Sequence, residues 1–272
     1  MKQRIAVQLY EQQQHIRFGT TLFALRDAVK PDADIVVCNG APATEDRKLE
    51  EGDAVVFIRR GETPTPETLE ALMAARHSPG IHKRLRAAAV GIAGLGGLGS
   101  SVAVALARIG VGRLILVDYD VVEPSNLNRQ QYFVDQIGMN KTDALCATLA
   151  RINPCVQVEP HFVRLAPPTI PSIFRAAAVV VEAFDQAEEK AMLMETMVRT
   201  LPDTPLVVAS GLAGYDSANR VQTRKVRRGL YLCGDGESAA QPGQGLMAPR
   251  VGVAAHHQAN AVMRLLLGEE PV

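Results

Sequence analysis

The chain has 272 residues, enough for one large domain or for a medium domain with a small one, each with a buried core. Its 29 basic and 29 acidic side chains balance, and only 4% of its residues are aromatic, so nucleic acid is not an expected partner. No apolar run approaches the ~20 residues of a membrane span and no signal-peptide core is visible, so we expect a cytoplasmic protein without a membrane partner.

The first sixty residues predict a small mixed sheet crossed by one helix. Alternating apolar residues indicate strands, and a threonine cap followed by helical spacing indicates the helix, which Pro31 ends. Turn signals such as Asn39-Gly40 separate the strands. In chain order, the predicted elements are strands at 4–10 and 15–18, a helix at 20–29, and strands at 35–38 and 54–58.

A proline-rich linker at residues 61–66 precedes a predicted helix at 68–76, and a larger domain follows. In that domain strands are predicted at 89–93, 114–117, 156–160, 178–182 and 206–210, and helices at 99–110, 141–153, 171–175, 188–201 and 251–267. This alternation predicts an α/β fold, a Rossmann-like and mostly parallel sheet with helices on both faces. Residues 217–250 are rich in glycine, proline and charge and predict a long excursion.

The pattern G-x-G-x-x-G occupies residues 94–99, between the strand at 89–93 and a helix. Such a turn lets the chain bend tightly and brings backbone amides close to phosphates at a helix N-terminus. Glycines that only permit close packing of a helix on a strand are the alternative. Because the strand and the helix are both predicted, the context favours a nucleotide site.

Asp118 ends the next strand, 19 residues after Gly99. An acidic residue at this spacing accepts hydrogen bonds from ribose hydroxyls, whereas a solvated strand-end aspartate is the alternative. Asp118 and the glycine turn fit an NAD-dependent dehydrogenase as well as an ATP-dependent enzyme. These two features alone therefore do not choose between the cofactors.

Polar side chains at residues 125–131 favour ATP. Asn126, Asn128 and Arg129 supply amide and guanidinium donors suited to phosphate oxygens, and Lys141 adds a point charge at a predicted helix start. Arg129 and Lys141 together would neutralise a triphosphate and stabilise the charge that builds on a departing pyrophosphate. A surface loop with two ordinary cations is the alternative.

Asp185 lies just past the predicted strand at 178–182. Carboxylates at the carboxyl ends of parallel strands face the ligand crevice, and one carboxylate suffices for Mg²⁺ that bridges phosphates. A helix N-cap is the alternative role. Zinc is not expected, because the chain's four cysteines form no C-x-x-C pair.

Together these segments resemble the ThiF/MoeB-type adenylyltransferases, relatives of the ubiquitin-activating enzymes, and within that family most closely ThiF, which prepares the sulfur carrier ThiS for thiamine thiazole synthesis. The resemblance covers about residues 76–268 and rests on the glycine turn, Asp118-Tyr119-Asp120, residues 125–130, Lys141 and Arg151-Ile152-Asn153-Pro154. It implies a homodimer that uses ATP and Mg²⁺ to adenylate the C-terminal glycine of a small β-grasp carrier ending in Gly-Gly.

By position, the resemblance implies a nucleotide site that consists of Gly94, Gly96, Gly97, Gly99, Asp118, Asp120, Ser125, Asn126, Asn128, Arg129, Lys141, Asp185 and Gln186. Asp118 would bind the ribose, and Asn126 and Arg129 would lie near the phosphates. Lys141 would bind the phosphate tail and Asp185 would hold Mg²⁺. Arg129, Lys141 and Asp185 are therefore the expected catalytic residues.

Two further catalytic candidates come from the resemblance. Arg76 occupies the place of an arginine that reaches into the partner subunit's active site, and a cation at a helix C-terminus is its alternative role. Cys233 lies in the excursion where several relatives carry a cysteine that bonds covalently to the carrier. A buried small apolar residue is the alternative for Cys233.

The first 61 residues resemble a ThiS/MoaD-type β-grasp domain, but Arg59-Arg60-Gly61-Glu62 runs on instead of ending in Gly-Gly. Without a free terminal glycine this domain cannot itself be adenylated, and we expect an inert carrier-like domain that aids dimerisation or docking. The predicted domains are therefore a β-grasp domain at 1–61, a linker and helix at 62–75, and an adenylyltransferase domain at 76–272.

Three alternatives remain open at this point. The carrier could be MoaD-like and serve molybdopterin synthesis or another sulfur-transfer pathway. The protein could be an NAD-dependent oxidoreductase, although no catalytic histidine is evident and His161 is the only histidine in the middle of the domain. It could also be a non-catalytic scaffold that binds a carrier.

Overall fold

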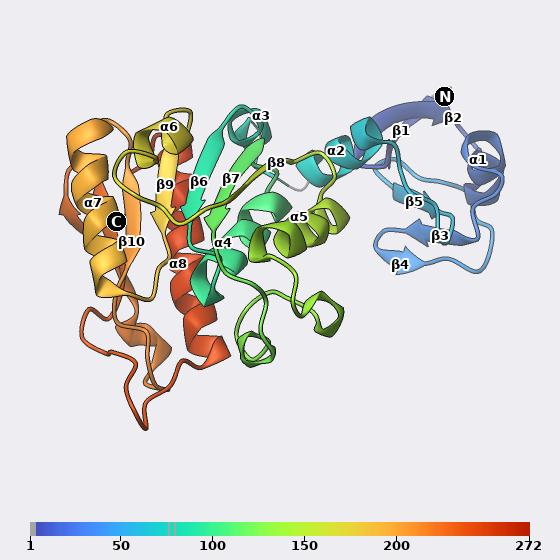
Figure 1. Cartoon of the computed structure of the whole chain (residues 1–272). Helices are drawn as coiled ribbons and strands as arrows, with labels where there is room; N and C mark the ends of the chain where they lie inside the picture. The colour runs from blue at the N-terminus through green and yellow to red at the C-terminus, as the bar shows by residue number, and fades with distance from the viewer. Residues whose placement is uncertain (1–3, 76, 79) are drawn as a thin grey trace. The chain divides into compact units, whose positions relative to one another are not determined.

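The computed structural model describes residues 4–75, 77–78 and 80–272 (Figure 1). The chain divides into two compact units, residues 1–78 and 79–272. Among the described residues, no helix combines the length and the apolar character that a membrane crossing needs. Arg76, one of the predicted site residues, lies outside the described residues.

The first unit is a mixed five-stranded sheet with strand order β2-β1-β5-β3-β4. Its strands are β1 (Arg4–Leu9), β2 (Gln12–Arg17), β3 (Ile35–Cys38), β4 (Ala41–Pro42) and β5 (Ala54–Ile58), and its helices are α1 (Leu22–Val29) and α2 (Pro66–Ala75). Thr21 caps α1, since its hydroxyl accepts from the amide of Ala24 at 3.2 Å. Leu22 and Leu25 of α1 pack in one core with Val7 and Phe57, which confirms the predicted small mixed domain.

The second unit is a seven-stranded sheet with strand order β11-β12-β10-β9-β6-β7-β8. Its strands are β6 (Ala89–Ala93), β7 (Arg113–Asp118), β8 (Gln157–Phe162), β9 (Val179–Glu182), β10 (Leu206–Ala209), β11 (Gln222–Arg227) and β12 (Leu230–Gly234). All neighbouring strands pair in parallel except β11 with β12. The predicted Rossmann-like sheet is therefore confirmed.

Helices cover both faces of this sheet (Figure 1). They are α3 (Ile81–Arg86), α4 (Gly97–Arg108), α5 (Lys141–Ile152), α6 (Ile170–Phe174), α7 (Ala187–Thr200) and α8 (Ala248–Leu266). Alternate residues of the central strands face opposite sides, so Val181 packs in the core of α4, α5 and α8, and Val180 in that of α6 and α7. Burial on both faces explains why these strands are continuous apolar runs.

The excursion at residues 217–250 contains regular structure that the sequence did not predict, namely the antiparallel pair β11 and β12. Most side chains of β11 are exposed, so this edge strand lacks an apolar pattern. The short elements α3 and β4 and the 3-10 turns η1 (Pro124–Asn126), η2 (Val134–Gln136) and η3 (Ala218–Arg220) were also not predicted. Elements this short carry too few residues for a periodic pattern.

Candidate functional site

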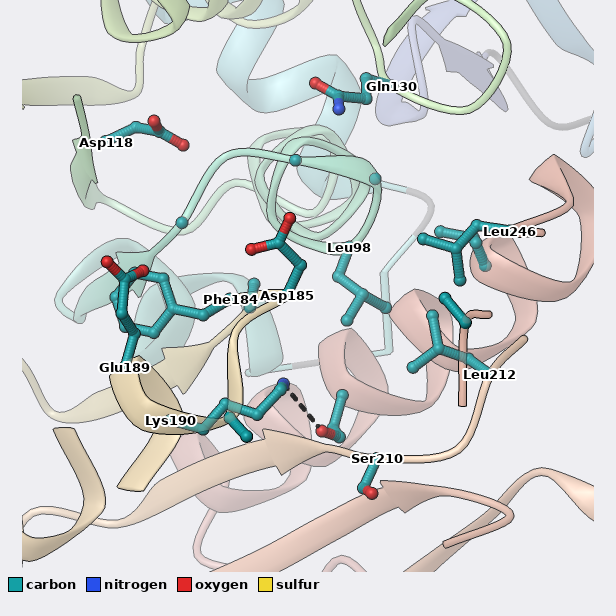
Figure 2. A pocket seen from close by; sticks show the side chains of 18 of the residues that line it. Leu98, Asp118, Gln130, Phe184, Asp185, Glu189, Lys190, Ser210, Leu212 and Leu246 are labelled. Atoms are coloured by element: carbon teal, nitrogen blue, oxygen red, sulfur yellow. Dashed lines mark hydrogen bonds between the residues drawn. The ribbon is translucent and has the colours of Figure 1, made fainter. Parts of the chain in front are cut away.

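A cavity of about 420 Å³ lies at the carboxyl ends of the central strands of the second unit (Figure 2). The strand order reverses between β6 and β9, and the loops that follow these two strands both line the cavity. Open α/β sheets bind ligands at this switch point, because neighbouring loops diverge there to opposite faces of the sheet. The fold itself therefore supplies the crevice.

The glycine turn serves both packing and the cavity. A methyl group at Gly99 would lie 1.8 Å from the carbonyl oxygen of Gly94, so Gly99 is required for close packing and is not among the lining residues. Gly96 has open space around its Cα and, with Gly94 and Gly97, lines the cavity at the start of α4. Gly96 is the N-cap of α4 and has no side chain to cap the first amides, which suits anion binding.

Asp118 fixes the glycine turn to the end of β7. Its Oδ2 accepts from the amide of Leu95 at 2.6 Å and its Oδ1 from the amide of Asp120 at 2.8 Å. Burial raises the pKa of Asp118, and the positive charge of Lys141 partly offsets that rise. Each carboxylate oxygen has a further lone pair, so Asp118 remains able to accept from ribose hydroxyls.

Two cations line the cavity close to the glycine turn. The Nζ of Lys141, a buried residue at the start of α5, lies 2.7 Å from the half-exposed Asp120 carboxylate. The Arg129 guanidinium donates to the Asn128 side chain at 2.9 Å and to the Ser125 carbonyl at 3.2 Å. Both cations keep donors for a bound anion, since a guanidinium has five N–H groups and an ammonium has three.

Five residues of the predicted nucleotide site do not line the cavity, namely Gly99, Ser125, Asn126, Asn128 and Gln186. Asn126 is buried and accepts from the amide of Glu123 at 3.1 Å, so it closes the η1 turn. Ser125 and Asn128 accept from Arg129, and Gln186 is the N-cap of α7 without a side-chain cap bond. The polar cluster therefore shapes the loop that presents Arg129, and most of it does not face the cavity.

Asp185 lies on the loop between β9 and α7, and its carboxylate points toward the glycine turn in Figure 2. Gln186 occupies the N-cap of α7, so Asp185 does not have the alternative role of helix cap. Within the described residues, no group of three or more His, Cys, Asp or Glu side chains is placed to hold a metal. A single carboxylate still fits Mg²⁺, which keeps most of its waters and takes its other ligands from phosphates.

Cys233 lacks the accessible thiol that the expected covalent bond to the carrier would need. It lies in β12, is fully buried, and its Sγ is 3.7 Å from the hydroxyl oxygen of Thr223. Burial raises the pKa of Cys233 to about 11, whereas a nucleophilic thiol needs a lowered pKa. The alternative, a buried small apolar residue, fits this position.

The sequence did not single out Lys190, which lines the cavity, or its buried partner Glu182. Lys190 lines the cavity, and its Nζ donates to the two Glu182 oxygens at 2.8 and 3.1 Å and to the Ala209 carbonyl at 3.0 Å. Glu182 is 1% exposed, and burial raises its pKa although Lys190 opposes the rise. The sequence signal that could have identified this pair is Glu182 itself, a charged residue at the end of the apolar strand predicted at 178–182.

The two ends of the cavity differ in chemistry (Figure 2). Asp118 and Glu189 lie at one end, and Leu98, Leu212 and Leu246 lie at the other. The lining of the cavity also includes small residues of the loops after β10 and β12, namely Ser210, Gly211, Ala213, Ser238, Ala239 and Ala240. The cavity thus combines a polar wall at the Asp118 end with an apolar wall at the leucine end.

Comparison with known proteins identifies both units. The model of the ThiF family matches residues 70–272, and that of ThiS-like ubiquitin matches residues 5–61. Adenylyltransferase and sulfurtransferase UBA4 of Yarrowia lipolytica is 31% identical over 196 residues, which are 68% of this chain and 47% of that protein. Adenylyltransferase and sulfurtransferase MOCS3 of Bos taurus is 43% identical over 130 residues, 47% of this chain and 28% of that protein.

The chain spans less than half the length of these curated relatives. These relatives are named UBA4 and MOCS3, and not ThiF. That the chain resembles ThiF most closely within the family therefore stays a prediction. Among solved structures, the E. coli tRNA N6-threonylcarbamoyladenosine dehydratase TcdA in complex with ATP matches this chain with a TM-score of 0.65 and 22% sequence identity. The match covers 72% of this chain and 92% of the TcdA chain, and it shows a similarity of fold. On the two family matches, the chain belongs to the ThiF family and carries a ThiS-like ubiquitin domain before its ThiF domain.

Proposed function

We propose that the protein binds ATP and adenylates the C-terminal glycine of a small β-grasp carrier protein, releasing pyrophosphate. The observation that supports this function best is the convergence of the glycine turn, Asp118, Arg129, Lys141 and Asp185 on one cavity. The relatives UBA4 and MOCS3, both named adenylyltransferases, point to the same reaction. The roles below rest on this proposal.

The proposed reaction needs no general base, because a carboxylate is already ionised at neutral pH. A carboxylate oxygen of the carrier's terminal glycine forms a bond to the α-phosphorus, and the bond from that phosphorus to the β-phosphate's bridging oxygen breaks. The electron pair leaves with pyrophosphate. Arg129 and Lys141 would stabilise the charge that builds on the leaving group, and the glycine turn would align the phosphates for attack.

We propose Asp185 as the residue that would hold Mg²⁺. Its side chain is exposed to the cavity, and the structure gives it no hydrogen bond or ion pair with a described residue. When bound, the ion would neutralise phosphate charge beside Asp185. Elsewhere in the site, Arg129 and Lys141 would neutralise the phosphate charge.

The leucine end of the cavity suits the carrier's tail. Small residues of the loops after β10 and β12 also line the cavity, and Gly211, Ala213, Ala239 and Ala240 leave room for a backbone but offer few side-chain contacts, as a Gly-Gly terminus would require. A tail that lies there would bring its carboxylate toward the nucleotide between Asp118 and Asp185. The carrier is therefore proposed to approach from the loops after β10 and β12.

We propose a ThiS-like carrier in thiamine thiazole synthesis as the specific substrate. The names UBA4 and MOCS3 favour the alternative, a MoaD-like or other carrier of a sulfur-transfer pathway. Purified carriers of both kinds, each ending in Gly-Gly, decide between these two substrates in the exchange assay described below.

The ThiS-like domain is proposed to be inert as a substrate. The segment that follows β5 is bonded back onto its own unit, with Arg59 2.8 Å from Asp32 and Glu62 paired with Lys30. It therefore has no free tail at the place where a carrier has its Gly-Gly terminus. Removing residues 1–62 should impair dimerisation or carrier binding, and unchanged behaviour in both would contradict the proposed role.

We also propose a homodimer in which Arg76 reaches the partner's site. Mixing Arg76→Ala chains with Lys141→Ala chains tests this, because a mixed dimer would then hold one complete site and recover activity. If Arg76 acts within its own subunit, each chain in the mixture lacks one group, and activity stays at the level of the single variants.

Carrier-dependent exchange of labelled pyrophosphate into ATP tests the proposed reaction. Arg129→Ala and Lys141→Ala should each lower the exchange rate by about 10²- to 10³-fold, the usual effect of removing a group that stabilises transition-state charge. Arg199→Ala, in the exposed last turn of α7, serves as a control that removes a cation outside the cavity. Absence of exchange with every Gly-Gly carrier, or full exchange by both cavity variants, would refute the mechanism.

A further inference from the structure

We propose that Glu189 selects the base of the nucleotide, by accepting a hydrogen bond from the 6-amino group of adenine. This inference rests on the proposed function, because it needs a nucleotide in the cavity. It adds a specificity-determining residue to that site and predicts that purines with an oxygen at position 6 bind more weakly.

The position of Glu189 follows from the direction of the expected ligand. With the phosphates at the glycine turn and the ribose at Asp118, the base must lie farther along the cavity, past the end of β7. Glu189, in the first turn of α7, lies at that end (Figure 2). Tyr119, the residue after Asp118, also lines the cavity, and its hydroxyl lies 3.4 Å from Glu189. Phe184 lies beside Glu189 in Figure 2, and its apolar ring suits the flat face of a purine. Other apolar side chains that line the cavity are Val117, Val163, Leu165 and Met192.

Three contacts hold the Glu189 carboxylate in place. Its Oε1 accepts from the Arg164 guanidinium at 3.0 and 3.1 Å and from the Tyr119 hydroxyl at 3.4 Å. Arg164 in turn lies over the Tyr119 ring, with its central carbon 5.3 Å from the ring centroid. The Glu189 side chain is 12% exposed. A side chain fixed in this way loses little freedom when a ligand binds.

The second oxygen of Glu189 is the one available to a base. All the hydrogen bonds and ion-pair contacts that the described residues make with this carboxylate involve Oε1, and Oε2 has none. A carboxylate only accepts hydrogen bonds. Adenine presents a donor at position 6, whereas guanine and hypoxanthine present a carbonyl oxygen that a carboxylate repels. Glu189 therefore supplies a chemical basis for choosing ATP.

The test compares dissociation constants of three nucleotides for the full-length protein, measured by isothermal titration calorimetry. They are ATP, inosine triphosphate, which has an oxygen at position 6, and purine riboside triphosphate, which has only hydrogen there. Wild-type protein should bind ATP on the order of 10- to 100-fold more tightly than inosine triphosphate, as expected for one hydrogen bond to a charged group. Purine riboside triphosphate should fall between them, because it loses the bond without the repulsion.

Glu189→Ala should bring the three dissociation constants to within about threefold of one another, well under 1.4 kcal/mol. Glu189→Gln should also lose the preference, because its amide can accept from an amino group or donate to an oxygen. The matched control is Glu188→Ala. Glu188 lies in the same first turn of α7 but is exposed and does not line the cavity, so this variant should keep the wild-type ratio.

Equal binding of ATP and inosine triphosphate by the wild type would overturn the assignment, as would a wild-type ratio in both Glu189 variants. If Glu189→Ala does not fold, as judged by circular dichroism, the ratio of Glu189→Gln decides. No nucleotide binding by the wild type would instead contradict the proposed function. The two failures are thus distinguishable.

Discussion

The carboxylate of Asp235 lies 2.6 Å from the guanidinium of Arg250, and both side chains are buried. Asp235 also accepts from the amides of Glu237 and Ser238, both at 2.8 Å. Arg250, in the first turn of α8, donates to the carbonyl of Asp216 at 2.8 Å. The ion pair thus joins the loop after β12 to α8, and the hydrogen bond to Asp216 adds the loop after β10. Both loops contribute lining residues to the cavity.

Arg250→Met should destabilise the protein by about 3–5 kcal/mol, because it leaves the Asp235 carboxylate buried without its cation. Urea unfolding of the variant and the wild type measures the difference. Arg220→Met is the control, because the exposed pair of Arg220 and Asp216 should contribute little. A stability of Arg250→Met equal to that of the control would show that hydrogen bonds alone suffice for Asp235.

The same carboxylate predicts a pH dependence. Although burial opposes ionisation, amide hydrogen bonds from Ser238 and Glu237 and the contact with Arg250 hold the pKa of Asp235 well below its usual range. A group with a lowered folded-state pKa stabilises the fold fully above its unfolded pKa, near 3.9, and loses this contribution as the pH falls toward the folded value.

Asp235→Asn should therefore be less stable than wild type at pH 6, and the gap should narrow as the pH falls below about 4. Unfolding free energies at a series of pH values measure the gap. A gap that stays constant down to pH 2.5 would mean that Asp235 titrates alike in the folded and unfolded chain.

Substitution by alanine should have different effects at Gly99, which is closely packed, and at Gly96, which lines the cavity. Gly99→Ala places a methyl group 1.8 Å from the Gly94 carbonyl oxygen and should cost about 3 kcal/mol, the upper range for overpacking. Gly96→Ala meets only Gln130 at 3.8 Å, so the fold should keep its stability. Since Gly96 lines the cavity, that variant should weaken ATP binding by crowding the phosphates. Thermal unfolding and calorimetric titration with ATP give the two readouts, and equal stability of both variants would contradict this division.

Strands with continuous apolar runs were predictable from the sequence, because burial on both faces demands them. The predicted range 89–93 matches β6, and the range 206–210 differs from β10 by one residue. By contrast, β11 is exposed and polar, and only its pairing with β12 makes it a strand. The local pattern of apolar residues therefore predicts the interior strands of the sheet. The edge strand β11 depends on tertiary contacts that this pattern does not record.

For the site, motif residues at strand ends were predictable because topology brings those ends together. Asp118 and Asp185 line one cavity for this reason, and their roles remain predictions. The face that a helix residue presents is not fixed by its spacing from a motif. Glu189 and Lys190 are adjacent charged residues of α7, and only packing on the sheet turns them toward the cavity.

Cys233 should be unreactive in the folded protein. With its pKa at about 11, only about one thiol in a thousand is ionised at pH 8, and the side chain is fully buried. Iodoacetamide at pH 8 followed by peptide mass spectrometry should label Cys233 only after unfolding. Cys233→Ala should keep pyrophosphate exchange, and rapid labelling of the native chain would contradict the buried assignment.

The pair of Glu182 and Lys190 predicts a stability defect that depends on pH. Lys190→Met removes the only cation that contacts the 1%-exposed Glu182 carboxylate among the described residues, and should cost about 3–5 kcal/mol at pH 7. Burial already raises the pKa of Glu182, and loss of Lys190 should raise it further, because that cation opposes the rise. A raised folded-state pKa means that the folded chain takes up a proton more readily than the unfolded chain.

The cost of Lys190→Met should therefore shrink as the pH falls and Glu182 becomes neutral. The double variant Glu182→Gln with Lys190→Met should recover most of the stability at pH 7, since it removes the buried charge altogether. Lys225→Met is the control, because the pair of Lys225 and Glu270 is exposed and should matter little. Urea unfolding at pH 5 and pH 7 measures all three variants, and a defect of Lys190→Met that the double variant does not relieve would point to lost packing of the lysine stem instead of an unpaired charge.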